Sequence, residues 1–230
     1  MNTKKRILLK ITGKAFLDKS ESLSTEIIRS IAQQIKSLKN THKFGIVIGG
    51  GNILRGEEQG LKIGLTPAFG HQAGMLATMI NGLILQDVFQ QEGIATSLLS
   101  ALFCPQICPI ISQQNIQNDA AIIFVGGTGA PYFTTDTNAI VRSLQIGANE
   151  VWKATDADGV YTTDPKKDPD ATLIKKLKYF DVIGKKLGIM DTTAIALAEK
   201  HKIRIRVFNI FSQNAILKAS EDESFGSLIN

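Results

Sequence analysis

The sequence predicts an α/β fold, a three-layer αβα sandwich with a mainly parallel central sheet. Runs of β-branched and aromatic residues alternate with helix-like stretches along the 230 residues, and this alternation is typical of a parallel sheet covered by helices on both faces. The hydrophobic fraction of 43% is enough for a large core, and the aromatic fraction of 7% suits an interior of Ile, Val, Leu and Ala. We therefore expect a single domain over residues 1–230.

Apolar periodicity places the expected elements along the chain. We expect strands at residues 6–11, 44–48, 94–99, 120–125, 150–155 and 203–208, the last with one solvated face. We expect helices at residues 24–39, 74–87, 136–145, 192–200 and 212–219, and a loop over residues 56–70. Asp191 precedes the fourth of these helices and is a natural N-cap residue.

Composition argues against several classes of protein. No apolar run reaches the length of a membrane span and there is no signal-peptide core, so we expect a cytoplasmic protein without a membrane partner. Cys104 and Cys108 are the only cysteines, and His42, His71 and His201 are isolated, so we expect reduced thiols and no metal site built by the protein. The net charge of +5 fits a nucleic acid or a small polyanionic substrate equally well. Because the lysines form no recognition pattern, we expect no nucleic-acid partner.

The strongest functional signal is the stretch GGTGAPYFTTD at residues 126–136, between a predicted strand and a predicted helix. Gly126, Gly127 and Gly129 allow a ligand to approach the backbone closely, and the threonines of the stretch add hydroxyl donors. Such a turn directs free N–H groups and the positive end of the helix dipole at one point, where an anion is stabilised. An ordinary strand–helix connection is the alternative interpretation of this stretch alone.

Neither of two common phosphate-binding fingerprints is present. A dinucleotide motif counted from Gly127 and Gly129 needs glycine at position 132, where the chain has Tyr132. A P-loop that starts at Gly51 needs lysine at position 57, where the chain has Glu57. A phosphate site in this chain therefore uses a different arrangement.

Two other predicted strands end in residues suited to phosphate. Lys10 lies at the end of the first strand, beside Thr12 and Gly13, and can reach phosphate oxygens without a P-loop. Three glycines at 49–51 follow the second strand, where a ligand can touch the backbone, and Arg55 follows within reach as a bidentate phosphate ligand.

The loop over residues 156–165 carries a third group of candidate residues. Its Asp158-Gly159 pair indicates a turn. Tyr161 and Asp164 on this loop are suited to flank a base and to accept a hydrogen bond from a ribose or an amine. A calcium loop is not indicated, because the acidic spacing departs from the EF-hand pattern.

Seven motifs follow one another in a fixed order. They are KITG at 10–13, VIGGGNILRG at 47–56, GMLAT at 74–78, GTGAPYFTTD at 127–136, KATDADGVYTTDP at 153–165, MD at 190–191 and IRVFN at 205–209. Together they resemble the motifs of the bacterial UMP kinases, a group within the amino-acid kinase family, over essentially the whole chain. One such motif is weak evidence, whereas the ordered set is specific.

The resemblance implies the amino-acid kinase fold and a reaction. The γ-phosphoryl group of ATP, bound with Mg²⁺, passes to UMP and gives UDP in pyrimidine nucleotide biosynthesis. The acceptor-binding part is then expected over about residues 1–150 and the ATP-binding part over about residues 151–230. UMP kinases of this group are hexamers, and the uniformly apolar stretch 74–89 also favours a homo-oligomer.

Carried over position by position, the resemblance assigns three sets of residues. The catalytic set is Lys10, Arg55, Asp136 and Asp191, in which the aspartates orient Lys10 or magnesium. The ATP-binding set is Lys10, Ile11, Thr12, Gly13, Gly51, Arg55, Thr155, Tyr161 and Asp164. The UMP-binding set is Gly50, Thr128, Gly129, Ala130, Pro131, Tyr132, Phe133, Thr134 and Thr135.

Three positions depart from the family pattern. His71 stands where the family usually has aspartate, Ala130 where it commonly has asparagine, and Lys14 where it usually has glutamate. The first two lie on the acceptor side, and they leave two alternatives open. One is a nucleotide-binding regulatory protein with little turnover, and the other is a sister kinase that acts on a carboxylate or a carbamate.

Overall fold

The computed structural model describes residues 4–54, 56–116, 120–165, 167–184 and 187–230, with the side chains of residues 56–58 outside this description. The strands are β1 (Lys5–Ile11), β2 (His42–Ile48), β3 (Thr96–Ser100), β4 (Ala121–Val125), β5 (Glu150–Thr155), β6 (Val160–Tyr161), β7 (Leu173–Ile174), β8 (Lys176–Leu177), β9 (Arg204–Asn209) and β10 (Ser227–Ile229). The helices are α1 (Glu26–Leu38), α2 (Gly56–Lys62), α3 (Pro67–Gln91), α4 (Thr135–Ile146), α5 (Tyr179–Gly184), α6 (Thr192–His201) and α7 (Ala215–Glu221), with a 3-10 turn at Gly13–Phe16.

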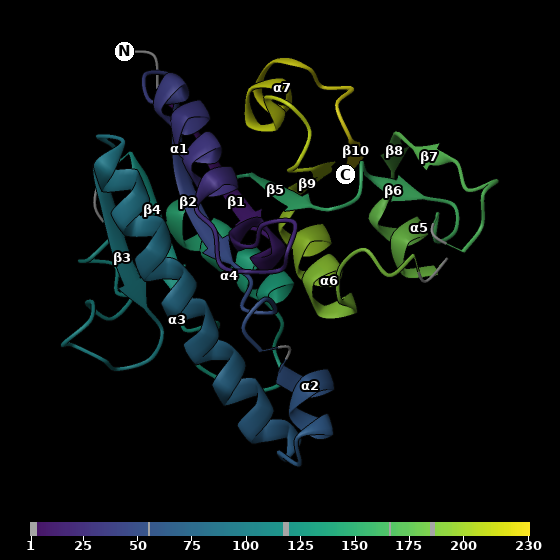
Figure 1. Cartoon of the computed structure of the whole chain (residues 1–230). Helices are drawn as coiled ribbons and strands as arrows, with labels where there is room; N and C mark the ends of the chain where they lie inside the picture. The colour runs from purple at the N-terminus through teal and green to yellow at the C-terminus, as the bar shows by residue number, and fades with distance from the viewer. Residues whose placement is uncertain (1–3, 55, 117–119, 166, 185–186) are drawn as a thin grey trace.

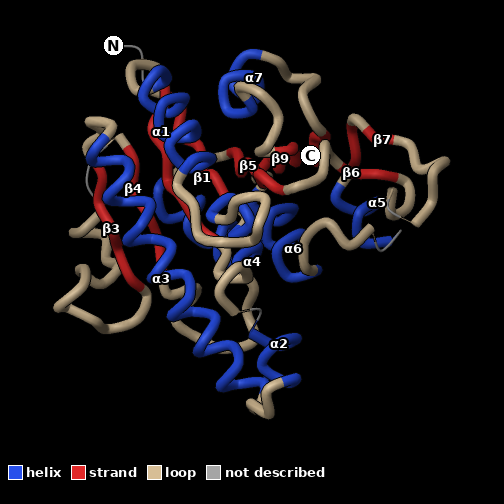
Figure 2. The backbone as a smooth tube through the Cα atoms, in the orientation of Figure 1, coloured by secondary structure: helices blue, strands red, loops and turns tan. Residues whose placement is uncertain are grey.

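Eight strands of the described chain form one sheet in the order β3-β4-β2-β1-β5-β9-β10-β8. All neighbours from β3 to β9 are parallel, and β10 is antiparallel to β9. Helices α1, α3 and α7 pack on one face, and α4, α5 and α6 pack on the other (Figure 1). Figure 2 shows the same layers, with the strands enclosed between the helices. This confirms the predicted three-layer αβα sandwich with a mainly parallel sheet.

Strand β1 lies in the interior of the sheet and pairs with β2 on one side and β5 on the other. Ile7, Leu8, Leu9 and Ile11 have no solvent exposure, because both faces of the sheet are covered by helices. Lys10 is the one residue that brings a charge into this apolar run. Its side chain reaches the carboxyl edge of the sheet, where the candidate site lies.

Side-chain caps fix the beginnings of the two helices nearest that edge. The hydroxyl of Thr134 accepts a hydrogen bond from the backbone N–H of Asp136 at 3.0 Å and so caps α4. Asp191 caps α6, as the sequence predicts, because its Oδ1 accepts from the backbone N–H of Ala194 at 2.8 Å. The positive ends of both helix dipoles are therefore held at the carboxyl edge.

The prediction of a loop over residues 56–70 is wrong. The structure has helix α2 over Gly56–Lys62, and α3 already begins at Pro67, where proline fits the first turn. The glycines that suggested a loop instead allow close helix packing. A Cβ built on Gly60 would lie 3.2 Å from the Cα of Gly70, so the two helices meet backbone to backbone.

The solvated face predicted for the strand at 203–208 is also wrong. Arg206 on β9 is only 2% exposed. Its Nη1 donates to the backbone carbonyls of Asp222, Glu223 and Phe225, which lie in the connection that follows α7. Arg206 Nε also lies 3.3 Å from the buried carboxylate of Glu150, so this charge marks a buried ion pair rather than a face open to water.

Strand β10 closes the other side of β9. The hydroxyl of Ser227 accepts from the backbone N–H of Val160 at 2.8 Å and donates to the carbonyl of Ile174 at 2.5 Å. These bonds fasten the small β6–β7 sheet, which precedes β10 by about fifty residues, to the main sheet.

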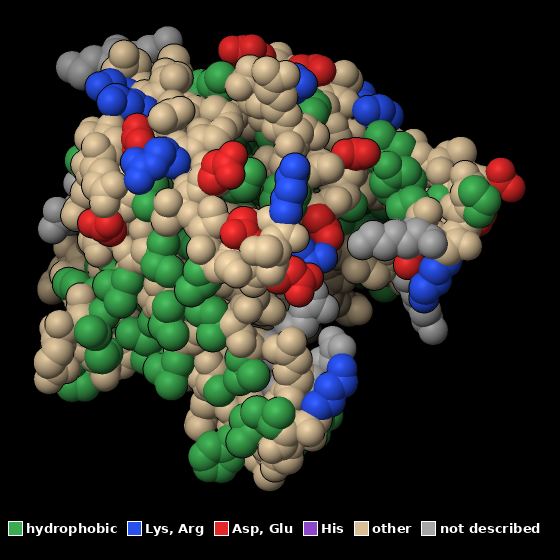
Figure 3. Space-filling model, viewed as in Figure 1, with side chains coloured by type: hydrophobic (Ala, Val, Ile, Leu, Met, Phe, Trp, Pro, Cys, Tyr) green, Lys and Arg blue, Asp and Glu red, His purple; other side chains and the backbone are tan. Residues whose placement is uncertain are grey.

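Helix α3 is the longest helix and is apolar nearly all round. Its buried side packs on the sheet, while Phe69, Leu76, Ile80 and Leu83 are 40–65% exposed. Figure 3 shows hydrophobic side chains gathered on this side of the molecule. Across the described residues, no helix combines the length and the apolarity needed to cross a membrane.

Glu150 is a fully buried carboxylate at the start of β5. Its oxygens accept from Trp152 Nε1 at 2.7 Å and from Arg204 at 2.6 Å, and Lys5 lies 3.2 Å away. Burial alone would raise the pKa of Glu150, but the hydrogen bond from Trp152 and the charges of Lys5 and Arg204 outweigh it and lower the pKa to about 2. The ionised form of Glu150 therefore stabilises the folded chain.

We expect Glu150→Gln to reduce the free energy of unfolding at pH 7 by up to about 3 kcal/mol, because the folded-state pKa lies well below the ordinary value. A depressed carboxyl pKa contributes stability above pH 4.5 and loses it as the pH falls from 4.5 towards 2. Urea unfolding at pH 7 and at several lower pH values would measure this contribution. The difference between the variant and the wild type should shrink with acidification, and equal stability at pH 7 would contradict the assignment.

Candidate functional site

The candidate site lies where several parallel strands end. β1 leads into the turn at Thr12 and Gly13, β2 into residues 49–52, and β4 into residues 126–134. The first turns of α4 and α6 reach the same edge. Open α/β sheets bind ligands at the carboxyl ends of their strands, so these turns surround the expected position for a ligand.

A buried carboxylate between two lysines forms the centre of the site. Lys10 on β1 and Lys153 on β5 are paired residues in the parallel register. Asp136, in the first turn of α4, reaches both of them. Its Oδ1 lies 3.0 Å from Lys10 Nζ and its Oδ2 lies 2.7 Å from Lys153 Nζ. Lys153 also donates to the backbone carbonyl of Ile189.

The electrostatics of this centre follow from burial and from the two cations. Burial raises the pKa of Asp136, but Lys10 and Lys153 together lower it below its ordinary value. Burial also disfavours the charged form of Lys153, and with repulsion from Lys10 it lowers the pKa of Lys153 to about 8. Asp136 is therefore an anion at neutral pH, and most Lys153 side chains carry a positive charge.

Asp191 forms a second part of the site next to this centre. Its carboxylate accepts a hydrogen bond from the hydroxyl of Thr134 and one from the hydroxyl of Thr137, which is shared between the two carboxylate oxygens at 2.8 and 3.0 Å. Because Thr134 and Thr137 belong to the start of α4 and Asp191 to the start of α6, these bonds join the two helix beginnings. The acidic side chain is thus fixed rather than free to swing.

The glycine turns after β1 and β2 lie against each other. A Cβ on Gly13 would lie 2.4 Å from Asn52 Oδ1, so only glycine fits there. Asn52 cannot easily move aside, because its side-chain amide exchanges hydrogen bonds of 3.1 and 2.7 Å with Asn81. Asn81 also donates to the carbonyl of Gly49 at 2.8 Å. A buried asparagine of α3 therefore sets the shape of both turns.

The turn after β4 has a backbone conformation that requires glycine at three positions. Gly126, Gly127 and Gly129 have φ values of 74°, 59° and 84°, which side chains other than glycine rarely adopt. The hydroxyl of Thr78 accepts from the N–H of Gly126 at 2.9 Å, and Arg142 donates to the carbonyl of Gly127 at 3.0 Å. α3 and α4 thus hold this turn from two sides.

Tyr132 and His71 meet on the outer side of this turn. Tyr132 has a φ of 69° although it carries a large side chain, and its ring centroid lies 5.2 Å from that of His71 on α3. Gly50 packs under the same helix, since a Cβ there would lie 2.8 Å from Ala77. Of the predicted acceptor-side positions, Tyr132 and Gly50 therefore both lie against α3.

Three of the predicted ATP-side residues, Thr155, Tyr161 and Asp164, lie at the end of β5 and on the segment that follows it. Thr155 ends β5, and its hydroxyl donates to Asp156 at 3.2 Å. Tyr161 donates to Asp158 at 3.3 Å, and Asp158 also accepts from Asn209 at 2.9 Å. The carbonyl of Asp164 closes the next turn by accepting two backbone N–H groups. Arg55, a predicted phosphate ligand, lies outside the described residues.

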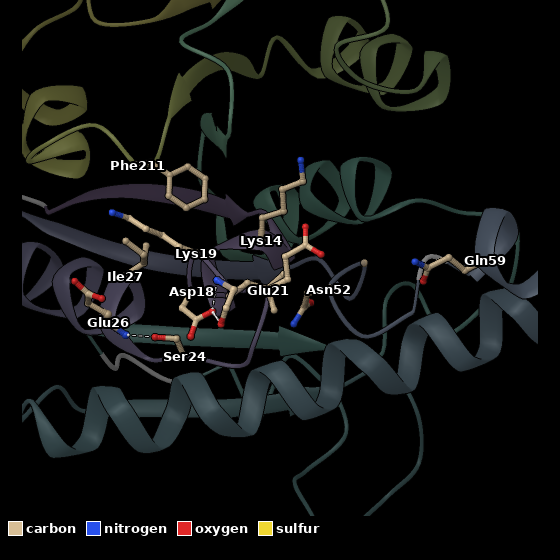
Figure 4. Close-up of a pocket in the computed structure, with 13 residues that line it drawn as sticks. Lys14, Asp18, Lys19, Glu21, Ser24, Glu26, Ile27, Asn52, Gln59 and Phe211 are labelled. Atoms are coloured by element: carbon tan, nitrogen blue, oxygen red, sulfur yellow. Dashed lines mark hydrogen bonds between the residues drawn. The ribbon is translucent and has the colours of Figure 1, made fainter. Parts of the chain in front are cut away.

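A cavity of about 990 Å³ adjoins the turns after β1 and β2. Figure 4 shows it between the segment at 17–27, Asn52 and Phe211. Lys14 and Gly51 are among the residues that line it, and Lys14 forms an ion pair of 2.6 Å with Asp156. A phosphate chain bound at the glycine turns would thus have open space beside it.

Four residues of the site were not singled out from the sequence. They are Lys153, Thr137, Asn52 and Asn81. Lys153 left a usable signal, because a lysine inside an apolar interior strand requires a buried anion. Asn81 left one too, as a polar residue within an almost wholly apolar helix. The structure joins the predicted Lys10 and Asp136 to Lys153, and the predicted Thr134 and Asp191 to Thr137.

Comparison with known proteins defines the class of protein. The amino acid kinase family matches residues 5–209, and the chain belongs to this family. Uridylate kinase of Methylococcus capsulatus is 38% identical over 231 residues, covering 98% of this chain and 96% of its own. Uridylate kinase of Rickettsia massiliae is 41% identical, covering 95% of this chain and 93% of its own.

Solved structures agree with the sequence relatives. The crystal structure of UMP kinase from Ureaplasma parvum matches with a TM-score of 0.94 and 32% identity, over 99% of both chains. That of UMP kinase from Bacillus anthracis matches with a TM-score of 0.91 and 29% identity, over 98% of this chain and 96% of the other. The predicted amino-acid kinase fold and the resemblance to UMP kinases are both confirmed.

We expect Gly13→Ala to lower the free energy of unfolding by about 1–3 kcal/mol, because the added methyl group collides with a side chain held by two hydrogen bonds. The matched control is Gly184→Ala, at an exposed position where a Cβ would meet nothing within 4 Å. The control should stay within about 0.5 kcal/mol of the wild type. Thermal unfolding of the three proteins would decide, and equal stability of the two variants would show that the turns are not tightly packed.

Proposed function

We propose that this chain is a kinase that transfers the γ-phosphoryl group of ATP to UMP and releases UDP. The observation that carries the proposal is the arrangement of two lysine ammonium groups around Asp136, beside the beginnings of α4 and α6 and between glycine-rich turns. The names of the relatives supply the nucleotide, because those proteins are uridylate and UMP kinases.

Phosphoryl transfer mainly requires that the protein position the reacting groups and place positive charge around the phosphate oxygens. Lys10 meets this need, because its ammonium group lies beside Asp136 and has three N–H donors, so that some of them are available to a phosphate. The beginnings of α4 and α6 add their dipoles. Within this mechanism Lys10 stabilises the transferring group, Asp136 orients Lys10, and Asp191 fixes the start of α4. Arg55 completes the proposed catalytic set.

The substrates are assigned to two parts of the chain. We place the nucleoside of ATP in the part formed mainly by residues 151–230, and its phosphates at the turns after β1 and β2. The proposed ATP-binding residues are Lys10, Ile11, Thr12, Gly13, Gly51, Arg55, Thr155, Tyr161 and Asp164. We place UMP in the part over residues 1–150, at Gly50, Thr128, Gly129, Ala130, Pro131, Tyr132, Phe133, Thr134 and Thr135. The transferring phosphoryl group then lies between them, over Lys10.

Mg²⁺ fits this site as a partner of the ATP phosphates. Both oxygens of Asp136 lie against lysine ammonium groups, and both oxygens of Asp191 accept hydrogen bonds. In the described part of the chain, no three His, Cys, Asp or Glu side chains form a metal-binding group. Mg²⁺ commonly keeps water and phosphate ligands rather than a protein cage. It would supply neutralising charge on the phosphates.

The apolar side of α3 supports an assembly of several copies. Phe69, Leu76, Ile80 and Leu83 are exposed in the single chain and share one side of the helix. An apolar surface of this kind is typical of a protein interface. We propose a homo-oligomer, with a hexamer as the specific form implied by the resemblance to UMP kinases.

We expect Lys10→Ala to lower kcat for UDP formation by at least about 100-fold, because a charge aimed at the transferring group is lost. A coupled assay with ATP, Mg²⁺ and UMP would measure the rate. Lys36→Ala, on the exposed side of α1, is the matched control and should retain the rate within twofold. Wild-type-like activity of Lys10→Ala would remove Lys10 from the mechanism.

The same assay separates the alternative functions. The wild type is tested with UMP, CMP, acetylglutamate, aspartate and carbamate as acceptors. UMP should be the preferred acceptor. Turnover of a carboxylate or of carbamate in place of UMP would indicate a sister kinase, and no turnover with binding of nucleotides would indicate a regulatory protein.

We expect light scattering of the purified protein at micromolar concentration to give a mass well above the 25.0 kDa of one chain. Ile80→Asp places a charge in the exposed apolar side of α3 and should lower that mass, because the charge would have to be buried in the interface. The matched control is Lys36→Asp, a charge change on α1. A monomeric wild type would contradict the proposed assembly.

A further inference from the structure

The ammonium group of Lys153 lies where a positive charge is energetically unfavourable. It pairs directly with Lys10 across β1 and β5, and neighbouring strands lie about 4.8 Å apart. Its side chain is only 11% exposed. Two like charges at this spacing, one of them buried, repel each other and lose hydration. The single carboxylate of Asp136 offsets both.

The hydrogen bonds of Lys153 differ from the contact of Lys10. Lys153 Nζ donates to Asp136 Oδ2 and to the carbonyl of Ile189, so two of its three N–H groups are directed into the protein. Ile189 stands two residues before Asp191. Lys153 therefore ties together β5, the start of α4 and the segment that leads into α6.

This contact also determines how Lys10 is held. With Lys153 on Oδ2, Asp136 offers Lys10 its other oxygen, at 3.0 Å. Without Lys153, both carboxylate oxygens would be available to Lys10, which would be drawn into a closer pair with Asp136 and away from a phosphate. Lys153 thus competes with Lys10 for the carboxylate of Asp136, and the ammonium group of Lys10 stays directed at the position of the phosphate.

The formal charges of the four ionisable side chains at this centre also support a role for Lys153. Lys10, Lys153, Asp136 and Asp191 are two cations and two anions, and their formal charges sum to zero. Removal of Lys153 leaves a net charge of −1 at the place where the phosphoryl group is to pass. Negative charge there opposes a transition state that carries its own negative charge on the phosphate oxygens.

We propose that Lys153 is a positioning residue for phosphoryl transfer, which holds Asp136 and the 189–191 segment so that Lys10 faces the transferring phosphate. This inference rests on the proposed kinase function. It predicts an effect on the chemical step rather than on substrate binding, because Lys153 directs its own donors into the protein.

The test is steady-state kinetics of Lys153→Met beside the wild type, with ATP and UMP varied in turn. We expect kcat to fall by about 100-fold, as for loss of a preorganised charge, and both KM values to stay within about threefold. Isothermal titration with UMP and with a non-hydrolysable ATP analogue measures binding without turnover. It should give dissociation constants within the same threefold range.

Glu150→Gln is the matched control, because it removes a buried charge from the other end of the same strand. It should lower the melting temperature but leave kcat within about threefold of the wild type. This contrast separates a role in the reaction from a general weakening of β5. A fall in kcat of Glu150→Gln as large as that of Lys153→Met would overturn the inference.

Lys153→Gln is the second variant, and it decides the question if Lys153→Met does not fold. Glutamine keeps hydrogen-bond donors but has no charge, so kcat should again fall by about 100-fold. A kcat within threefold of the wild type for either folded variant, or a loss that appears only in KM, would refute the role of Lys153. If the wild type itself forms no UDP, the proposed function fails instead.

Discussion

The site depends on one carboxylate shared by two ammonium groups. Asp136 lies between Lys10 and Lys153 on neighbouring strands, and it can do so because the Thr134 cap begins α4 directly above them. Without an anion at this point, the parallel register that sets the two lysines side by side would be strongly unfavourable. The pairing of β1 with β5 and the start of α4 are therefore coupled in this fold.

Other polar side chains fix the helix ends and turns around this carboxylate. Asp191 caps α6 and accepts hydrogen bonds from two threonines at the start of α4. Asn81 of α3 similarly sets the turn after β2. Glycine-rich segments are flexible on their own, but here each one is held by a polar side chain from a packed helix.

Much of this could be predicted from the sequence, because local signals were strong. The apolar runs predicted the strands of the sheet, and the glycines at 126–129 predicted a turn between a strand and a helix, which the structure has with positive φ values. The sequence around a buried charged residue could not identify the residue that pairs with it. The apolar strand around Lys153 signals a buried anion, but nothing near Lys153 or Arg206 in the sequence shows which chain segment supplies the partner, because those segments are distant in the sequence. The loop prediction over residues 56–70 failed for a related reason. Glycine is favoured both in loops and where two helices pack closely, and the local sequence does not distinguish the two.

The bonds of Ser227 have a consequence for how the protein is made. The backbone N–H of Val160 and the carbonyl of Ile174 both depend on the hydroxyl of Ser227. On the ribosome, the segment that carries Tyr161 emerges well before residues 227–229. During that interval it has no strand to fasten it to the main sheet. These two bonds between the β6–β7 sheet, which carries the proposed ATP-side residue Tyr161, and the main sheet can therefore form only after Ser227 has been made.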